Sequence, residues 1–444
     1  MDNDGEYDSG LGARLVDDAY RYGEQAFHRQ EPFVPGVTPI PPSGKVIGGA
    51  EISNAIRAVL EGVLTEGPWV TVFERLLAAT AGVRHASMCN SGSSANLLVL
   101  GALKSAKAPA ELRLKPGDEI VTSAVGFPTT LNAILHNGLR PVFVDIELGT
   151  YVPSAEAILT ALTHETGAVF MAHTLGNPFP LDIEDELRGW GVSLVEDNCD
   201  ALGSTYKGKM TGGFGIAATQ SFYPAHHITT GEGGAVLTNS GRLRRAVESL
   251  RDWGRDCWCE PGADNTCGKR FEHCFEGLPP GYDHKYITAE IGYNLKSTDI
   301  QAAIGMAQLE RLKLFTAARQ ANFGWLMAGL ADLGQYIIVP RATEWADPSW
   351  FGFPITMQQG LDRQPLLKFL AERRIGTRNL FGGNLLRQPA YRGMAEAEGW
   401  RVCGPLTNAD VVTESAFWIG CWPGLGKPAI DFMVETLHEY FVRP

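Results

Sequence analysis

The chain has 444 residues, of which 44% are hydrophobic and 20% are charged, and its formal net charge at pH 7 is -12. These values indicate a globular protein of about two or three domains and argue against nucleic acid or an anionic membrane surface as a partner. The N-terminus lacks the basic and apolar regions of a secretory signal, and no run of about 18 apolar residues occurs. We therefore expect a soluble cytoplasmic protein with reduced cysteines.

Residues 1–49 are predicted to form a lead-in to the first domain. Within them, a helical stretch over residues 11–30 is closed by a segment rich in proline and glycine at residues 32–49. A second helix over residues 52–64 then begins a large domain, which we expect to cover residues 50–317.

Apolar strands alternate with helices in this large domain. The predicted strands cover residues 119–124, 141–145, 167–173 and 193–197. They are apolar on both faces, as the strands of a buried parallel sheet are. We therefore predict an α/β domain with a mostly parallel sheet, in which ligands sit at the carboxyl ends of the strands.

An irregular insert at residues 252–290 interrupts the alternation, and it is rich in Cys, Gly, Pro and aromatic residues. An insert of this length without regular structure is usually functional. A helix over residues 297–317 follows, and residues 318–444 are predicted to form a smaller C-terminal α/β domain. Its expected elements are a strand at 351–355 and helices at 365–373 and 429–441.

Three segments carry side chains that suit a cofactor. Ser93 and Ser94 precede an apolar helix, where hydroxyls and free N–H groups suit a phosphate, although a simple helix cap explains them equally well. Phe127 follows a strand and could stack on a flat heterocycle or belong to the core. Asp197 ends a strand, where a carboxylate could bind a pyridinium N–H or serve as a cap.

Residues 221–234 form the most informative segment of the chain. Ser221 could bind a phosphate, and a Gly-rich turn closes the segment at residues 231–234. Alone, His226 and His227 would be ordinary loop histidines.

Together these segments resemble, in order along the chain, the DegT/DnrJ/EryC1/StrS sugar aminotransferase family, over about residues 40–440. The resemblance implies a type I pyridoxal phosphate-dependent transferase fold, like that of aspartate aminotransferase, and a homodimer. It also implies cofactor contacts from Ser93, Ser94, Phe127, Asp197, Ser221 and, from the neighbouring subunit, Asn294. This chain departs from the family at two positions. His226 replaces the Schiff-base lysine, and Asp200 replaces an amide or a histidine.

A second constellation consists of thiols with the spacing C-x57-C-x-C-x7-C. Cys257, Cys259 and Cys267 lie in the irregular insert, whereas Cys199 comes two residues after Asp197. Four thiolates can hold an iron–sulfur cluster or a zinc ion, but the spacing matches neither zinc ribbons nor common ferredoxins. The residues alone leave three readings open: iron–sulfur, zinc and unrelated thiols. The nearby Cys274 also leaves the ligand set open.

A narrower resemblance combines this spacing with residues 223–228, 252–257, 281–286 and 347–353. These stretches resemble the CDP-6-deoxy-L-threo-D-glycero-4-hexulose 3-dehydrases of 3,6-dideoxyhexose synthesis. That resemblance implies a [2Fe–2S] cluster on Cys199, Cys257, Cys259 and Cys267 beside pyridoxamine 5'-phosphate. It also implies a nucleotide-sugar substrate and, as electron donor, an NAD(P)H-dependent iron–sulfur flavoprotein reductase or a ferredoxin.

The expected reaction removes the C3 hydroxyl group of CDP-4-keto-6-deoxyglucose. His226 would act as the base at C4′ of the cofactor, since a neutral imidazole suits proton abstraction near pH 7. Tyr223 and Asp200 would assist. Three alternatives remain: a dTDP-sugar 3-dehydrase of antibiotic-sugar synthesis, a pyridoxal phosphate-dependent sugar aminotransferase and a non-catalytic metal sensor. Candidate cations for a substrate phosphate are Lys45, Lys285, Arg378 and Arg387.

Overall fold

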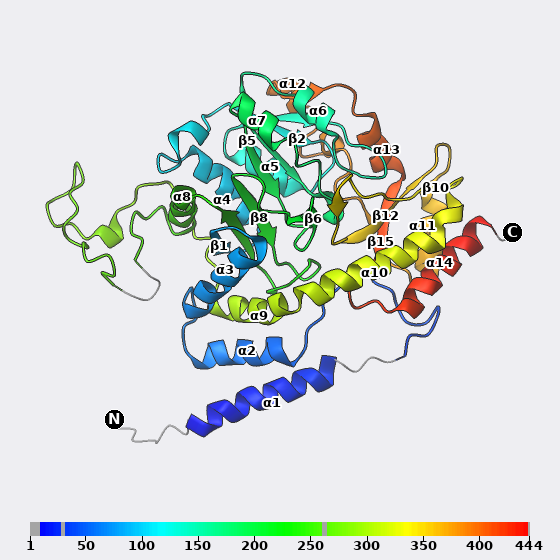
Figure 1. Cartoon of the computed structure of the whole chain (residues 1–444), viewed down its shortest axis with the longest axis horizontal. Coiled ribbons are helices and arrows are strands. Elements are labelled where there is room, and N and C mark those ends of the chain that lie inside the picture. Colours follow the sequence, from blue (N-terminus) through cyan, green and yellow to red (C-terminus); the bar gives the residue numbers. More distant parts are fainter. Residues whose placement is uncertain (1–8, 28–31, 260–263, 443–444) are drawn as a thin grey trace.

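The computed structural model describes residues 9–27, 32–259 and 264–442 (Figure 1). Its large domain is built on an eight-stranded sheet with the order β1-β9-β8-β5-β4-β2-β3-β14. The strands are β1 (His85–Cys89), β2 (Glu119–Ser123), β3 (Arg140–Val144), β4 (Thr166–Ala172), β5 (Ser193–Asp197), β8 (Ala217–Ser221), β9 (Gly234–Thr238) and β14 (Arg401–Cys403). Neighbouring strands run parallel except where β9 pairs with β1 and β8.

Helices cover both faces of this sheet. On one face, α4 (Gly92–Lys104), α5 (Pro128–His136) and α8 (Gly241–Arg251) pack on a buried cluster that includes Leu98, Phe170 and Val195. On the other face lie α3 (Pro68–Ala81), α6 (Ala155–Thr160), α7 (Glu184–Trp190) and α9 (Asp299–Glu310). Burial on both faces explains why the sequence of these strands is apolar without alternation.

The smaller domain contains a four-stranded antiparallel sheet. Its strands, in order, are β10 (Ile337–Ile338), β12 (Gly352–Met357), β15 (Ala416–Gly420) and β13 (Arg378–Asn379). The helices α10 (Leu312–Leu330), α11 (Arg363–Glu372) and α14 (Lys427–Phe441) pack on it through a cluster that includes Leu326, Phe353 and Leu437. A short sheet of β11 (Ala346–Asp347), β6 (Thr205–Tyr206) and β7 (Lys209–Met210) joins the two domains.

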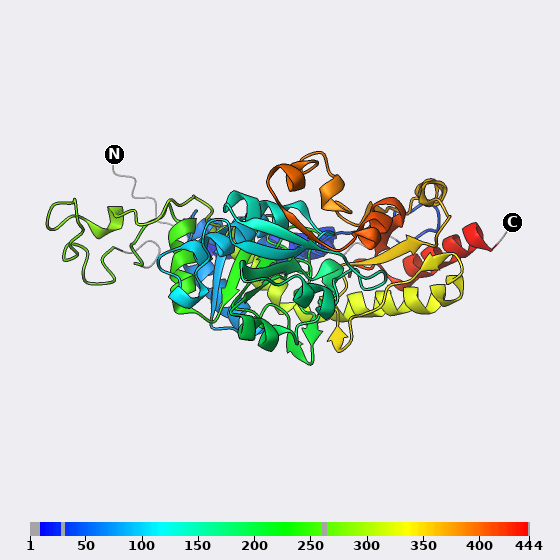
Figure 2. The ribbon, with the colours of Figure 1, turned by 90° about the horizontal axis from the view of Figure 1, so that it is seen from above.

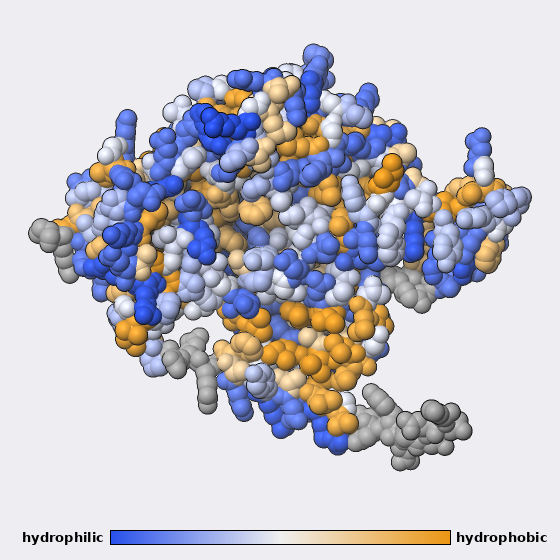
Figure 3. Space-filling model, turned by 180° about the vertical axis from the view of Figure 1, so that it is seen from behind, coloured by the Kyte–Doolittle hydropathy of each residue, from blue (hydrophilic) through white to orange (hydrophobic). Residues whose placement is uncertain are grey.

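The N-terminal helix α1 (Ser9–Phe27) lies outside the main body. It packs on α2 (Gly49–Leu60), which in turn packs on α9 (Figure 1). Apolar side chains gather at this end of the molecule (Figure 3), and exposed ones on α1 and α2 include Leu15, Val59 and Leu60. No helix among the described residues is both long enough and apolar enough to cross a membrane.

One predicted helix is wrong as a single element. The helix predicted over residues 297–317 is two helices, α9 and α10, which meet at Arg311, and the expected domain boundary at 317–318 lies within α10. The helix predicted over residues 52–64 is α2, which ends at Leu60. Of the helix predicted over residues 11–30, residues 11–27 lie in α1, and the rest lie outside the described residues.

Residues 252–290, here called the cysteine lobe, extend from the body beyond α8 in both views (Figures 1 and 2). Within the described part of the lobe, the one regular element is a short 3-10 helix at His284–Tyr286. At the lobe's neck, Gly254 has a φ of +76°, and a Cβ atom there would lie 1.8 Å from the carbonyl oxygen of Glu290. The neck therefore needs a glycine where its two chain segments touch.

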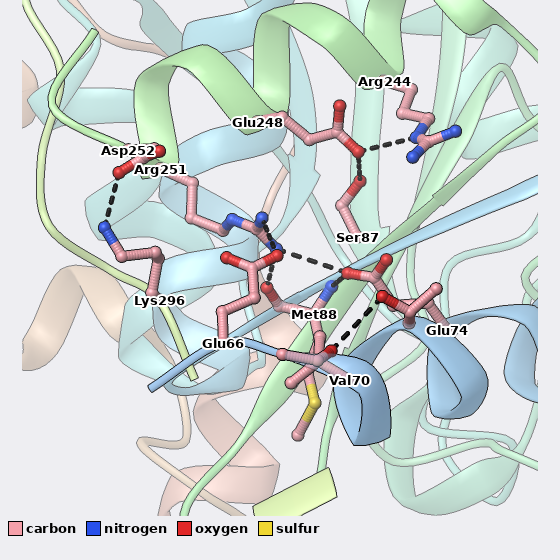
Figure 4. A network of polar contacts seen from close by, with 12 residues as sticks. Glu66, Val70, Glu74, Ser87, Met88, Arg244, Glu248, Arg251, Asp252 and Lys296 are labelled. Carbon is pink, nitrogen blue, oxygen red and sulfur yellow. Dashed lines mark hydrogen bonds and ion pairs between the residues drawn. The ribbon is translucent and has the colours of Figure 1, made fainter. Parts of the chain in front are cut away.

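A buried arginine fixes α8 next to this neck (Figure 4). Arg251, the last residue of α8, donates to the carboxylates of Glu66 and Glu74 and to the carbonyl oxygen of Met88. Glu74 belongs to α3 and Met88 to β1, so one guanidinium group joins three elements of the large domain. A buried charge that is paired in this way is costly to unpair.

Candidate functional site

The carboxyl ends of β2, β5 and β8 meet at one edge of the sheet, and the predicted cofactor residues gather there. Beside this edge, α4 begins with Ser91 as its cap, whose Oγ accepts a hydrogen bond of 3.1 Å from the N–H of Ser94. Ser93 is exposed beside it. A Cβ atom at Gly92 would lie 2.5 Å from that of Ser221, so the first turn of α4 touches the end of β8. The residues predicted to bind phosphate are therefore neighbours.

Asp197 is the most densely hydrogen-bonded residue of the site. Its side chain is buried, and its Oδ2 accepts from Asn96 Nδ2 at 2.8 Å and from Thr130 Oγ1 at 2.6 Å. Oδ1 accepts from the N–H of Cys199 at 3.3 Å and from Thr219 Oγ1 at 3.4 Å. These four donors hold the carboxylate in one orientation.

Two aromatic side chains form an open rim around this edge. Phe127 and Tyr223 are each 52% exposed. The rings of Phe127 and Phe381 are perpendicular, with centroids 6.1 Å apart, and the exposed part of the Phe127 ring is available for stacking.

The loop after β8 presents His226 to the site. Its backbone N–H donates to the carbonyl oxygen of Tyr223 at 2.9 Å, which closes a tight turn. The buried Arg319 donates to the carbonyl oxygen of His226 at 3.1 Å and also to those of Trp350 and Phe351. Arg319, on α10, thus ties the histidine loop to the small domain.

The side chains of His226 and Asp200 face each other beside the sheet edge. Nδ1 of His226 lies 3.4 Å from Oδ1 of Asp200, but has no hydrogen-bond partner among the described residues. Burial, together with the charge of Arg319, lowers the pKa of His226 to about 4, so the imidazole is neutral at pH 7. Burial and the charge of Asp197 raise the pKa of Asp200 to about 8.

The thiols occupy two separate places within the chain. Cys199 lies in the site itself, where a Cβ atom at Gly92 would come within 2.9 Å of its Sγ. Cys257, Cys259 and Cys267 line a small pocket in the cysteine lobe, with 3.7 Å between the Sγ atoms of Cys259 and Cys267. Cys274 is exposed in the same lobe.

The pKa values of two lobe thiols are shifted in opposite directions by their surroundings. Burial raises the pKa of Cys257. At Cys259, hydrogen bonds from Cys267 and its neighbours outweigh burial and lower the pKa of the thiol to about 6. Within the described part of the chain, no group of three or more His, Cys, Asp or Glu side chains is arranged to hold a metal ion. One chain as described therefore does not bring the four predicted ligands together.

Asn294 and the candidate cations lie in different surroundings. Asn294 is exposed, and the next residue, Leu295, accepts a hydrogen bond of 2.9 Å from the N–H of Asn90. Lys45 lines a pocket together with His226 and Arg319. The remaining three cations are elsewhere: Lys285 beside the lobe thiols, Arg378 exposed on β13, and Arg387 in an ion pair of 2.7 Å with Asp410.

Sequence reasoning missed three residues that organise the site. Asn96 and Thr130 hold Asp197, and Arg319 holds the histidine loop. Asn96 follows the Ser-rich segment and Thr130 follows Phe127, so proximity to two predicted residues was the available signal. Arg319 has no such signal, because it lies 93 residues after His226.

Comparison with known proteins places this geometry among sugar-modifying enzymes. The model of the DegT/DnrJ/EryC1/StrS aminotransferase family matches residues 46–438. The lipopolysaccharide biosynthesis protein RfbH of Salmonella typhimurium is 52% identical over 417 residues, which are 93% of this chain and 94% of that protein. The dTDP-4-dehydro-2,6-dideoxy-D-glucose 3-dehydratase of Saccharopolyspora spinosa is 51% identical over 423 residues, which are 94% and 90% of the two chains.

A solved structure supports the same conclusion for the fold. The Escherichia coli GDP-4-keto-6-deoxy-D-mannose-3-dehydratase with bound hydrated PLP matches with a TM-score of 0.79 and 29% identity, and covers 90% of this chain and 99% of that one. The predicted pyridoxal phosphate-dependent transferase fold, with its mostly parallel sheet, is thereby confirmed.

Proposed function

Because the chain belongs to the DegT/DnrJ/EryC1/StrS aminotransferase family, we propose that it is a nucleotide-sugar 3-dehydratase that works with pyridoxamine phosphate. The single observation that carries this proposal is His226 at the position of the family's Schiff-base lysine. An imidazole forms no Schiff base with the cofactor, but it is a good general base at neutral pH. The family supports either amination or deoxygenation of a sugar, and the histidine favours deoxygenation.

Several features of the site support the binding of pyridoxamine phosphate. The buried Asp197 offers a fixed carboxylate to the pyridine nitrogen, and Phe127 offers an exposed ring face. Ser93, Ser94 and Ser221 surround the start of α4, and Asn90 has a buried Oδ1 without a partner among the described residues. When bound, the cofactor supplies an amine for the C4 ketone and a ring that withdraws electrons.

His226 is the residue we assign to proton transfer at C4′ of the cofactor. Its lowered pKa keeps the ring neutral throughout the physiological pH range, so one of its two nitrogens carries no proton. Asp200, 3.4 Å away, is in place to orient the ring through Nδ1. Tyr223 lies on the rim of the site, and we propose that its hydroxyl group assists departure of the C3 hydroxyl group.

Replacement of the C3 hydroxyl group by hydrogen releases water and consumes two electrons and two protons. We propose that a [2Fe–2S] cluster carries the electrons. The thiols that would hold it are Cys199, Cys257, Cys259 and Cys267. An NAD(P)H-dependent iron–sulfur flavoprotein reductase or a ferredoxin would supply the electrons. Within the described residues of one chain, however, the four thiols lie in two separate places and do not form one cluster site.

Two nucleotides are candidates for the substrate. We propose CDP-4-keto-6-deoxyglucose, on the sequence stretches that accompany the cysteine pattern. A dTDP-linked 4-keto-2,6-dideoxyhexose is the second candidate, since the 51% identical relative is a dTDP-sugar 3-dehydratase by name. Turnover of the two sugars side by side distinguishes them.

Exchange of the C3 oxygen tests the dehydration without any electron donor. The protein is incubated with pyridoxamine phosphate and the 4-keto sugar in isotopically labelled water. Reversible dehydration predicts that label enters the C3 hydroxyl group only when the cofactor is present. If no label enters C3, while glutamate supports amino-group transfer to C4, the protein is an aminotransferase and the proposal is wrong.

A further inference from the structure

The cysteine lobe holds three thiols in one pocket, and the site at the sheet edge holds the fourth. Cys257, Cys259 and Cys267 share their pocket with Arg270, His284 and Lys285, and no residue of the sheet lines it. Cys199 instead contacts Thr219, with 3.9 Å between Sγ and Oγ1, and the start of α4. The chain therefore offers an incomplete set of thiols at each place.

Helix α4 separates these two places. At its first turn, Gly92 touches Cys199. Beyond its last turn, Lys107 Nζ forms an ion pair of 2.6 Å with Asp256, the residue before Cys257. The helix has 13 residues, and at 1.5 Å per residue its ends are about 18 Å apart. Thiolates that bind one metal ion lie only about 2.3 Å from it, so this separation is far too large for a shared site.

Three contacts hold the base of the lobe at the far end of α4 and on α8. Besides the ion pair of Lys107 with Asp256, Ser105 donates to Glu290. The guanidinium group of Arg245, on α8, lies 5.1 Å from the ring centroid of Trp258. Within the lobe, Asp256 also pairs with the buried His284 at 3.0 Å, so Lys107 is anchored to an ordered carboxylate. A swing of the lobe toward Cys199 of its own chain would break the contacts with Lys107, Ser105 and Arg245.

The lobe and the segment that follows it expose an unusual number of large apolar side chains. They are Trp253, Trp258, Phe271, Leu278, Tyr282, Tyr286, Ile291 and Tyr293. Ile291 is 98% exposed and Tyr286 is 65% exposed. The rim of the cofactor site is apolar and open as well, at Phe127 and Tyr223. Apolar surfaces of this kind are typical of protein interfaces.

We propose that a second copy of this chain completes the thiol site, so that Cys257, Cys259 and Cys267 of one protomer meet Cys199 of the partner subunit. The number of thiols points to a second copy as the partner, because each lobe lacks a fourth thiol and each cofactor site holds one, Cys199, which is partly exposed. A twofold axis would then produce two equivalent four-thiol sites per dimer. The inference rests on the proposed function for the presence of a cluster, and it adds that the cluster spans two subunits.

A mixed dimer tests this arrangement through its iron content. One protomer carries Cys199→Ser, and the other carries Cys257→Ser, Cys259→Ser and Cys267→Ser. The two have different affinity tags, are co-expressed and are isolated as the mixed dimer. If the cluster spans the subunits, the mixed dimer has one complete site and binds half of the iron of the wild-type dimer. Each variant alone as a homodimer binds none.

The alternatives give different results. If the four thiols meet within one chain, neither protomer of the mixed dimer has a complete set, and an iron-free mixed dimer would overturn the inference. Cys403→Ser, in β14, is the control and should keep the full iron content and the electron paramagnetic resonance signal of the reduced cluster. A wild-type protein that binds zinc or no metal contradicts the iron–sulfur half of the proposed function instead. Size-exclusion chromatography verifies that every sample is a dimer, and a monomeric wild-type protein also overturns the inference.

Discussion

Nδ1 of His226 lies 3.4 Å from Oδ1 of Asp200, and both side chains are largely buried beside the carboxylate of Asp197. Burial favours the neutral form of each partner, so the pKa of His226 falls to about 4 while that of Asp200 rises to about 8. The pair therefore holds one imidazole neutral over a wide pH range. This property suits a base in a reaction that does not attach the cofactor to the protein.

Replacement of His226 separates dehydration from amino transfer. His226→Asn removes the base, and we expect oxygen exchange at C3 to fall by about 100-fold or more. Binding of the cofactor, measured by its absorbance, should remain. His226→Lys restores the family's residue and should gain amino-group transfer from glutamate while it loses exchange. Full exchange activity in either variant contradicts the role given to His226.

The pH dependence of the reaction should report Asp200. Below its raised pKa of about 8, the Asp200 carboxyl group is protonated and can donate a hydrogen bond to Nδ1 of His226. The proton of the neutral ring then lies on Nε2, the nitrogen that must act as base. Above that pKa, the carboxylate accepts from Nδ1–H and frees the other nitrogen. We therefore expect kcat/KM for exchange to rise with pH through about 8.

Asp200→Asn is the matched variant for this profile. Its amide oxygen can accept from Nδ1–H at every pH, so the rise near pH 8 should disappear, with a maximum rate below that of the wild type. If the variant retains the same rise, another group titrates and the orienting role of Asp200 is wrong.

Arg319 should be needed for stability because it is a buried cation with three carbonyl partners. Arg319→Met leaves the carbonyl groups of His226, Trp350 and Phe351 without their donor. We expect a loss of about 3 kcal/mol in the free energy of unfolding, measured by chemical denaturation. Arg378→Met removes an exposed arginine and should change stability by less than about 0.5 kcal/mol. Equal effects of the two substitutions would show that the buried contacts of Arg319 contribute little.

The exposed ring of Phe127 should matter for cofactor affinity and hardly for stability. Phe127→Ala removes a stacking face worth about 1 kcal/mol, which corresponds to about fivefold weaker binding of pyridoxamine phosphate. Phe127→Tyr keeps the face and should bind as the wild type does. Fluorescence titration of the cofactor measures both variants, and unchanged affinity in Phe127→Ala means that the ring does not contact the cofactor.

The sequence predicted β2, β3, β4 and β5 because their apolar residues are buried on both faces, but it did not predict the other four strands of the large sheet, β1, β8, β9 and β14. It predicted one helix over residues 297–317 because no glycine or proline marks the break at Arg311. The fourfold cysteine pattern was visible, but the division of the thiols was not. That division depends on where Lys107 anchors Asp256, a contact between residues 149 positions apart. Local patterns do not carry such information, and the same holds for Arg319.

The most direct test of the central claim is the product of one complete reaction. The protein, with pyridoxamine phosphate and its reconstituted cluster, is reduced under anaerobic conditions and mixed with CDP-4-keto-6-deoxyglucose, and the sugar is analysed by mass spectrometry and nuclear magnetic resonance. Reductive dehydration predicts a 4-keto sugar that has lost the C3 oxygen and gained no nitrogen. A product that keeps its C3 hydroxyl group and carries an amino group at C4 would contradict the account.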